Sequence, residues 1–251
     1  MKSTGRFIVI EGLDGAGTST QVKMLSKHLR GIGLSVHTTK EPSNGPIGRQ
    51  LRDAVEGRVS LTVEALALGF AADRLDHMNP VNGVERRLAD GTWVVSDRYV
   101  LSSLAYQAAQ GVDFDWLVEI NRHAREPDVT VFVDTPIETC LKRIRARNAN
   151  AEDLFHRRTA LRSVGDAYVR ALALGRFAGV LTTADGRLPI DDVFAQTCDG
   201  IGEALANDLG LFSAAPVSSV PPRKHDVNSV SARLLKEVGA PSQAGSLQSK
   251  A

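Results

Sequence analysis

A glycine-rich turn near the start of the chain has the residue types of a phosphate-binding loop. The apolar run 8–10 leads into three closely spaced glycines, and a helix-compatible segment follows at once. Gly12, Gly17 and Ser19 fit the pattern G-x-x-x-x-G-K-[ST]. Backbone amides of such a turn, together with the N-terminus of the next helix, bind phosphate oxygens. The residues expected to surround the phosphates of a bound nucleotide are Gly12, Leu13, Asp14, Gly15, Ala16, Gly17, Thr18, Ser19 and Thr20.

The lysine of this pattern is missing, because Thr18 stands in its place. That lysine normally carries a positive charge to the β- and γ-phosphates. A hydrogen bond to a charged group contributes about 1.5–3 kcal/mol, and more where charge develops in a dry site. We therefore expect another basic side chain to supply the charge. Lys23 is a poor candidate, since it lies one turn further along the expected helix. A loop that binds nothing is the alternative.

A second apolar run, 93–96, ends in Asp97 and Arg98. A carboxylate at the end of a strand beside a phosphate loop can hold Mg²⁺ or its waters, and the Ser19 hydroxyl would complete this metal site. Arg98 can bind an acceptor phosphate through two parallel hydrogen bonds. The alternative for Asp97 is a simple cap on the following helix.

Short apolar strands alternate with helical segments along most of the chain. Strands are predicted at 6–10, 34–39, 92–96, 129–133 and 179–183, and helices at 21–31, 62–74, 102–110, 137–147 and 161–174. This alternation predicts an α/β fold of three layers, in which helices cover both faces of a five-stranded, mainly parallel sheet. Ligands bind at the carboxyl ends of such strands, where both motifs fall.

Composition and charge restrict the partners of the protein. A net charge of +1 over 251 residues gives no overall attraction to nucleic acid or to a membrane surface. The N-terminus has neither a signal peptide nor an apolar run long enough to cross a membrane, so we expect a cytoplasmic protein. Cys140 and Cys198 lack metal or redox spacing, and we expect neither to be reactive.

The composition changes after about residue 211, where small and polar residues replace the apolar pattern. We expect one folded domain over 1–211 and a disordered tail over 212–251. Within this tail, 230–238 has the pattern of a short amphipathic helix, and its length favours a transient helix over a partner-binding one.

Four motifs together resemble the thymidylate kinase family, which belongs to the P-loop nucleoside monophosphate kinases. In chain order they are E-G-L-D-G-A-G at 11–17, E-P at 41–42, F-A-A-D-R at 70–74 and D-R-Y-V-L-S-S-L-A-Y-Q at 97–107. The last motif is the most diagnostic, and the similarity extends over about residues 2–209. It implies a P-loop NTPase-type fold with a lid at about 143–158. It also implies ATP-dependent phosphorylation of dTMP to dTDP with Mg²⁺, a step toward dTTP, in a homodimer.

The resemblance also assigns the residues of the acceptor site. The implied substrate-binding residues are Phe70, Arg74, Ser103 and Gln107 at the thymine, Asp14 and Tyr99 at the sugar, Arg52 and Arg98 at the phosphate, and Glu41 beside them. Stacking of a base on an aromatic ring such as Phe70 contributes about 1–3 kcal/mol. Ser103 and Gln107 are four residues apart on one expected helix, so they can reach a common target.

Arginines gather around the expected lid. Five of them fall between 143 and 158. Thymidylate kinases without a basic residue at the variable positions of the phosphate loop place catalytic arginines in the lid, so this chain resembles the lid-arginine type. The number of arginines here also motivates the hypothesis that one of them replaces the missing lysine. The catalytic residues expected on this basis are Asp97, Arg98, Arg143, Arg147 and Arg158.

Two other functions stay open at this point. Loss of the lysine is compatible with a degenerate kinase that binds nucleotides without turning them over. The second alternative is a kinase for another nucleoside monophosphate. Phe70, Ser103 and Gln107 argue against it.

Overall fold

The structure is a computed structural model that describes residues 4–79, 81–147 and 154–205. The predicted tail over 212–251, with its helix at 230–238, lies outside these residues. So do the middle of the predicted lid, 148–153, and the end of the predicted domain, 206–211.

Five strands form one sheet in the order β2-β3-β1-β4-β5, and every neighbouring pair is parallel. The strands are β1 (Phe7–Glu11), β2 (Val36–Lys40), β3 (Trp93–Asp97), β4 (Val129–Asp134) and β5 (Val180–Asp185). The predicted five-stranded α/β fold is therefore confirmed, with a sheet that is wholly parallel in the described part of the chain. Every residue of β1 and β4 is buried, as expected for strands covered on both faces.

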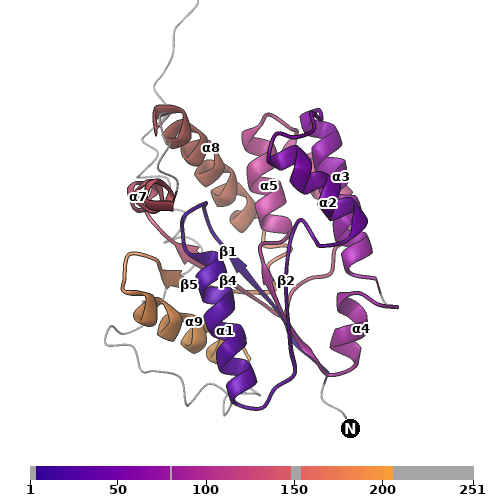
Figure 1. Cartoon of the computed structure of the whole chain (residues 1–251), viewed down its shortest axis with the longest axis vertical. Coiled ribbons are helices and arrows are strands. Elements are labelled where there is room, and N and C mark those ends of the chain that lie inside the picture. Colours follow the sequence, from indigo (N-terminus) through magenta and orange to yellow (C-terminus); the bar gives the residue numbers. More distant parts are fainter. Residues whose placement is uncertain (1–3, 80, 148–153, 206–251) are drawn as a thin grey trace, which may run out of the picture.

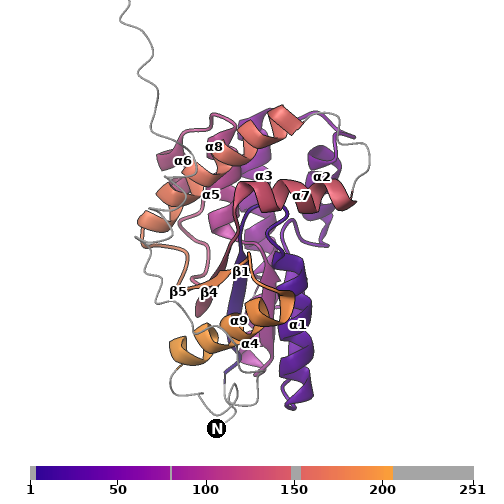
Figure 2. The same ribbon diagram turned by 90° about the vertical axis from the view of Figure 1, so that its left-hand side faces the viewer.

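Helices cover both faces of the sheet (Figures 1 and 2). On one face, α1 (Thr18–Gly31) packs on β1, β2 and β3 and against α9 (Ile190–Ala204), which covers β4 and β5. The remaining helices are α2 (Pro46–Val55), α3 (Val63–His77), α4 (Val84–Ala89), α5 (Val100–Ala109), α6 (Phe114–Ile120), α7 (Ile137–Arg147) and α8 (Leu154–Ala173). Among them, α5 packs against α6 and α8, α2 against α3, and α4 against β3.

The structure contains four helices that the sequence reading did not predict: α2, α4, α6 and α9. Both α4 and α6 make fewer than two full turns, which is too short for a helical period to stand out. Helix α2 starts with a proline, and α9 has two aspartates in its first turn. Both are common signals for the start of a helix, but a prediction based on helical periodicity alone does not use them. The predicted helix at 161–174 also begins earlier, at Leu154.

The carboxyl ends of the central strands place the chemical residues at one edge of the sheet. Glu11, Asp97 and Asp134 end β1, β3 and β4, which are neighbours, and the glycine-rich turn follows β1 directly. Both cysteines are buried thiols, and burial raises the pKa of Cys198 to about 12, which agrees with the expectation that neither is reactive. Among the described residues, no helix has both the length and the apolar character needed to cross a membrane.

Candidate functional site

The turn between β1 and α1 has the backbone of a phosphate loop. Gly17 caps α1 in a left-handed conformation with φ of 108°, and its carbonyl accepts the first helical hydrogen bonds, from Thr20 N and Gln21 N. A side chain at Gly15, where φ is 84°, would lie 2.6 Å from the carbonyl oxygen of Cys140. The left-handed backbone favours glycine at both positions, and at Gly15 the loop backbone also lies too close to α7 for a side chain.

Ser19 and Asp97 meet at the open end of this loop. The Ser19 hydroxyl donates a hydrogen bond to Oδ2 of Asp97, while Oδ1 of Asp97 is buried without a hydrogen-bond partner among the described residues. A hydroxyl and a carboxylate are hard oxygen ligands of the kind that Mg²⁺ takes, with nucleotide phosphates and waters filling its other positions. No cluster of three or more His, Cys, Asp or Glu side chains suited to a metal occurs in the described ranges. The pair thus fits a metal that arrives with the nucleotide.

Arg143 brings a positive charge to the loop that lacks its lysine. From α7, Nη1 donates to the carbonyl of Ala16 at 2.9 Å, and Nη2 donates to the carbonyl of Gly186 at 2.8 Å. Thr18 itself is buried, with 6% of its surface exposed. The other lid arginines described are placed differently: Arg158 pairs with Glu138 at 2.6 Å, and Arg147 lines a neighbouring cavity.

That neighbouring cavity lies between the loop, α7 and the start of α9. Its volume is about 320 Å³, and its walls are largely apolar. Its lining includes Gly17 and Thr20 of the loop and α1, Arg143 and Arg147 of α7, and Leu188 and Ile190 near the start of α9. The sequence reading did not predict this cavity, since nothing in the spacing links 188–190 to the loop.

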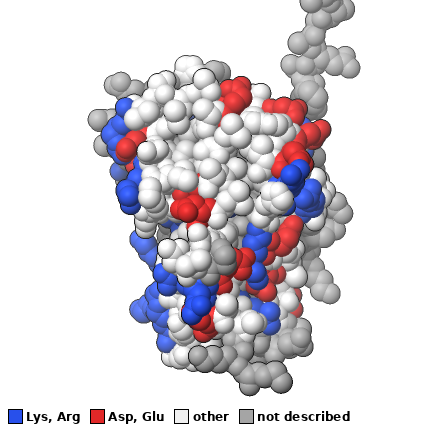
Figure 3. Space-filling view, turned by 90° about the vertical axis from the view of Figure 1, so that its right-hand side faces the viewer, with Lys and Arg blue, Asp and Glu red and all other residues white. Residues whose placement is uncertain are grey.

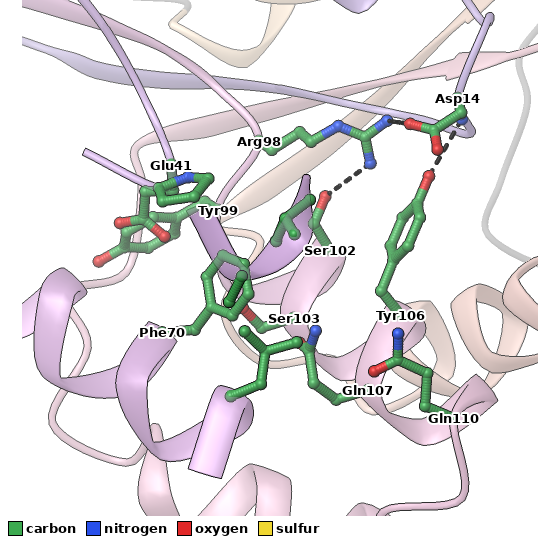
Figure 4. A pocket seen from close by; sticks show the side chains of 14 residues that line it. Asp14, Glu41, Phe70, Arg98, Tyr99, Ser102, Ser103, Tyr106, Gln107 and Gln110 are labelled. Atoms are coloured by element: carbon green, nitrogen blue, oxygen red, sulfur yellow. Dashed lines mark hydrogen bonds and ion pairs between the residues drawn. The ribbon is translucent and has the colours of Figure 1, made fainter. Parts of the chain in front are cut away.

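A cavity of about 410 Å³ opens on the other side of the loop, between α2, α3 and α5 (Figure 4). Seven predicted substrate residues line it: Asp14, Glu41, Phe70, Arg98, Tyr99, Ser103 and Gln107. Oε1 of Gln107 and the hydroxyl of Tyr99 are buried without hydrogen-bond partners among the described residues. Buried polar atoms are normally paired, so these two atoms are suited to meeting a ligand.

Arg98 joins this cavity to the phosphate loop. Its backbone is left-handed, with φ of 71°, and its guanidinium pairs with Asp14 of the loop at 2.7 Å. The same guanidinium donates to the Ser102 hydroxyl at 3.3 Å and lies over the Tyr106 ring, 4.9 Å from its centre. Arg98, which the sequence predicts to bind the acceptor phosphate, therefore lies within reach of both this cavity and the phosphate loop.

Arg74 is almost fully buried and does not line the cavity. Its Nη2 lies 2.6 Å from Oε2 of Glu41 and donates to the Ser103 hydroxyl at 2.7 Å. Nη1 donates to Oδ1 of Asn121, and the guanidinium lies 5.1 Å from the centre of the Tyr99 ring. In this structure Arg74 therefore braces the wall that carries Glu41, Tyr99 and Ser103, and its contact with a base stays a prediction.

Arg52 also lies behind the cavity wall. It donates hydrogen bonds to the carbonyl of Ser43 at 2.8 Å and to that of Pro42 at 3.3 Å. It therefore holds the turn that follows β2, and its contact with an acceptor phosphate remains untested.

Three polar lining residues were not predicted from the sequence: Ser102, Tyr106 and Gln110. The hydroxyl of Tyr106 accepts a hydrogen bond from the Asp14 amide at 3.1 Å, so this ring stands beside the loop. Tyr106 lies three residues after Ser103, Gln110 lies three residues after Gln107, and Ser102 lies four residues before Tyr106. A search along that helical stripe would have found them.

Comparison with known proteins agrees with this geometry. The family model described as thymidylate kinase matches residues 10–196. The chain belongs to the thymidylate kinase family. That match spans the phosphate loop, both cavities and the start of α9.

Individual members of the family support the assignment. A probable thymidylate kinase of Thermococcus kodakarensis is 43% identical over 154 residues, covering 58% of this chain and 74% of the relative. One of Caldivirga maquilingensis is 39% identical over 166 residues, covering 65% and 79%. One of Methanocaldococcus jannaschii is 37% identical over 177 residues, covering 70% and 87%.

The Glu41–Arg74 pair gives a prediction about stability. Replacing Glu41 by Gln leaves the Arg74 charge buried without its counter-ion, which costs about 3–5 kcal/mol. The matched control is Asp115→Asn, which breaks the exposed pair with Arg170 and should cost less than about 1 kcal/mol. Equilibrium unfolding in urea measures both. Equal losses in the two variants would contradict the role given to the buried pair.

Proposed function

We propose that the chain transfers the γ-phosphoryl group of ATP to dTMP, giving ADP and dTDP. The observation that carries this proposal is the position of Arg98. It is bound to Asp14 of the phosphate loop and at the same time lines a cavity that offers Phe70 and the unpaired oxygen of Gln107. A nucleotide base stacked in that cavity would direct its 5′-phosphate toward the loop.

The reaction needs little from protein side chains beyond position and charge. An oxygen of the dTMP phosphate attacks the γ-phosphorus, and the new P–O bond forms as the bond to the bridging oxygen of ADP breaks. The acceptor is already anionic, so no protein nucleophile or strong base is required. Since the transition state is loose and its charge is spread over oxygens, fixed donors and cations lower the barrier. Arg98 is suited to holding the acceptor, and the loop amides to holding ATP.

The sugar and base of ATP fit the second cavity. Leu188 and Ile190 supply an apolar surface next to Gly17 and Thr20, while Arg143 and Arg147 form the opposite wall. A guanidinium plane stacks readily on an aromatic base. With ATP bound in this way, we expect the triphosphate to run along the loop toward Asp97.

We also propose that Mg²⁺ enters with ATP, held by Ser19 and by Asp97 directly or through water. When bound, the metal neutralises charge on the β- and γ-phosphates. The Ser19 hydroxyl holds Oδ2 of Asp97 by a hydrogen bond, and Oδ1 of Asp97 is buried without a partner among the described residues, which suits it to a ligand that enters with the nucleotide.

One coupled assay of ADP release tests this function. We expect turnover with dTMP to exceed that with CMP and AMP by at least about 100-fold, because a site built on specific polar contacts rejects a mismatched base strongly. With dUMP, which lacks one methyl group, the loss should be about tenfold. Chelation of Mg²⁺ should abolish turnover. Binding of dTMP without turnover of any acceptor would instead establish a non-catalytic nucleotide-binding module.

Arg143 is our candidate for the cation that compensates for Thr18. It is the lid arginine that contacts the loop directly, and a Cβ at Gly17 would lie 3.9 Å from its Nη1. Arg158 is engaged by Glu138 on the far side of α7, and Lys23 is exposed on α1. We assign to Arg143 the charge that a lysine brings elsewhere, with Arg147 beside it.

A double-mutant cycle tests this compensation. We expect Arg143→Gln to lower kcat by about 30-fold or more, in line with the loss of one transition-state contact. Introducing Thr18→Lys should restore part of that loss, so the effect of Arg143→Gln becomes smaller in the Thr18→Lys background. Lys23→Gln serves as the control and should leave kcat unchanged. Additive effects of the two substitutions would refute compensation.

We further propose a homodimer that forms through α3. Exposed apolar side chains follow one stripe of this helix at Ala65, Leu68, Ala72 and Leu75, while Val55 is exposed on the neighbouring α2. The upper part of this side of the molecule, over α2 and α3, carries few charged side chains (Figure 3). A contiguous apolar stripe on a helix is typical of a surface that packs on a partner. We place the enzyme in the cytoplasm, where its buried thiols stay reduced.

Analytical ultracentrifugation tests the dimer. The native protein should sediment as a dimer, with twice the chain mass of 27.0 kDa. The Leu68→Lys variant should sediment as a monomer, because the lysine places a charge in an apolar interface. Val180→Lys, at a similarly exposed residue of the edge strand β5, should remain dimeric. A monomeric native chain at micromolar concentration would exclude the dimer.

A further inference from the structure

A single buried carboxylate holds the turn that carries the acceptor arginine. Glu11, the last residue of β1, is completely buried. Its Oε1 accepts from Tyr99 N at 2.8 Å and from Ser102 N at 3.2 Å. Its Oε2 accepts from the Ser102 hydroxyl at 2.5 Å and lies 2.9 Å from the hydroxyl of Tyr168. A buried carboxylate is tolerated only with such a set of donors.

These bonds make Glu11 the cap of α5. The first amides of a helix lack partners inside the helix, and Tyr99 at the cap position offers no side-chain hydrogen bond. The carboxylate supplies the missing acceptor, and its charge suits the positive end of the helix dipole. Since Arg98 directly precedes this cap, Glu11 fixes the direction in which Arg98 leaves β3. Ser102 links the two, because its hydroxyl contacts both Glu11 and the Arg98 guanidinium.

Tyr168 connects the same carboxylate to α8. Its hydroxyl lies 2.8 Å from that of Ser102 and 3.2 Å from the carbonyl oxygen of Gly12, at the start of the phosphate loop. The ring is fully buried and packs edge-on against Phe132, 5.3 Å between ring centres. Three turns earlier on α8, Arg157 lines a cavity together with Asp14 of the loop. The Tyr168 hydroxyl therefore ties the helix that carries this arginine to β1.

We propose that Glu11 and Tyr168 are positioning residues for phosphoryl transfer. Through Glu11, one hydrogen-bonded centre sets Arg98 on the acceptor side, and Tyr168 anchors α8, which carries Arg157, to the same centre. Neither residue touches a reacting atom. The inference rests on the proposed dTMP kinase activity and assigns to that site one buried centre that connects Arg98 to α8.

The network functions with Glu11 as a carboxylate. Burial raises the pKa of Glu11, while the Ser102 hydroxyl, the charge of Arg98, the Tyr168 hydroxyl and the Tyr99 amide oppose that rise. Of the other charged groups nearby, Asp14 is already paired with Arg98. The carboxylate is lost as the pH falls through the raised pKa, so activity with dTMP should fall on the acid side. Removing the Tyr168 hydroxyl takes away one opposing donor and should move that acid limb to higher pH.

The Tyr168→Phe variant of the full chain tests the inference, since it keeps the buried ring and deletes only the hydroxyl. We expect kcat/KM for dTMP to fall about tenfold, as for loss of one hydrogen bond to a charged group, with KM for ATP within about twofold of the native value. The acid limb of kcat/KM should shift to higher pH. Titration of the dTMP phosphate is common to all variants and cancels in this comparison. Ser102→Ala, which removes the shared hydroxyl, should give the same split.

The control is Arg170→Gln, on α8 but paired with exposed Asp115, which should match the native enzyme in both parameters. Two results would overturn the inference: native kinetics in Tyr168→Phe, or equal losses for dTMP and ATP with an unshifted acid limb, which indicates general destabilisation. Urea unfolding of each variant identifies that second case. If the native chain turns over no dTMP, the proposed function fails and this inference fails with it. Active native enzyme with unaltered Tyr168→Phe overturns the inference alone.

Discussion

The ion pair between Arg98 and Asp14 is the interaction on which the organisation of the site depends. Asp14 belongs to the turn after β1, and Arg98 to the turn after β3, so the pair joins the two halves of the site across neighbouring strands. Its strength does not come from burial alone, because the Asp14 side chain is 59% exposed. Position matters more: a left-handed backbone at Arg98 and the Tyr106 ring beneath its guanidinium restrict where this cation can lie.

The sequence was sufficient for the fold because local pattern and topology agree. Short runs of apolar, β-branched residues identified all five strands. The glycine and serine spacing between Gly12 and Ser19 located the phosphate loop. Lining of the cavity by Phe70, Ser103 and Gln107 follows from family motifs and helical spacing. The strands and the loop depend on neighbours within a few positions of the chain, and the cavity residues belong to motifs whose order along the chain is characteristic of the family.

Other features depend on contacts that spacing cannot reveal. Arg74 carries the same charge whether it meets a base or a carboxylate, and only the approach of Glu41 from 33 residues away decides that it braces the wall. Tyr106 stands beside the loop because α5 packs there, and the cavity at Leu188 forms because α9 returns to α1. The middle of the lid and the tail lie outside the described residues, so the predictions made for them remain predictions.

The contact between Gly15 and Cys140 has a consequence for the thermodynamics of nucleotide binding. With no side chain between them, the loop backbone rests on α7, and Arg143 from that helix grips the loop carbonyls as well. Protein interiors are close-packed and hardly compressible. We therefore expect the phosphate loop and α7 to behave as one rigid unit before a nucleotide binds. The conformational entropy of the Arg143 side chain is then lost when the protein folds and not when the nucleotide binds. Under the function proposed for Arg143, ATP would meet a preorganised charge, and preorganisation favours tighter binding than a mobile lysine would give.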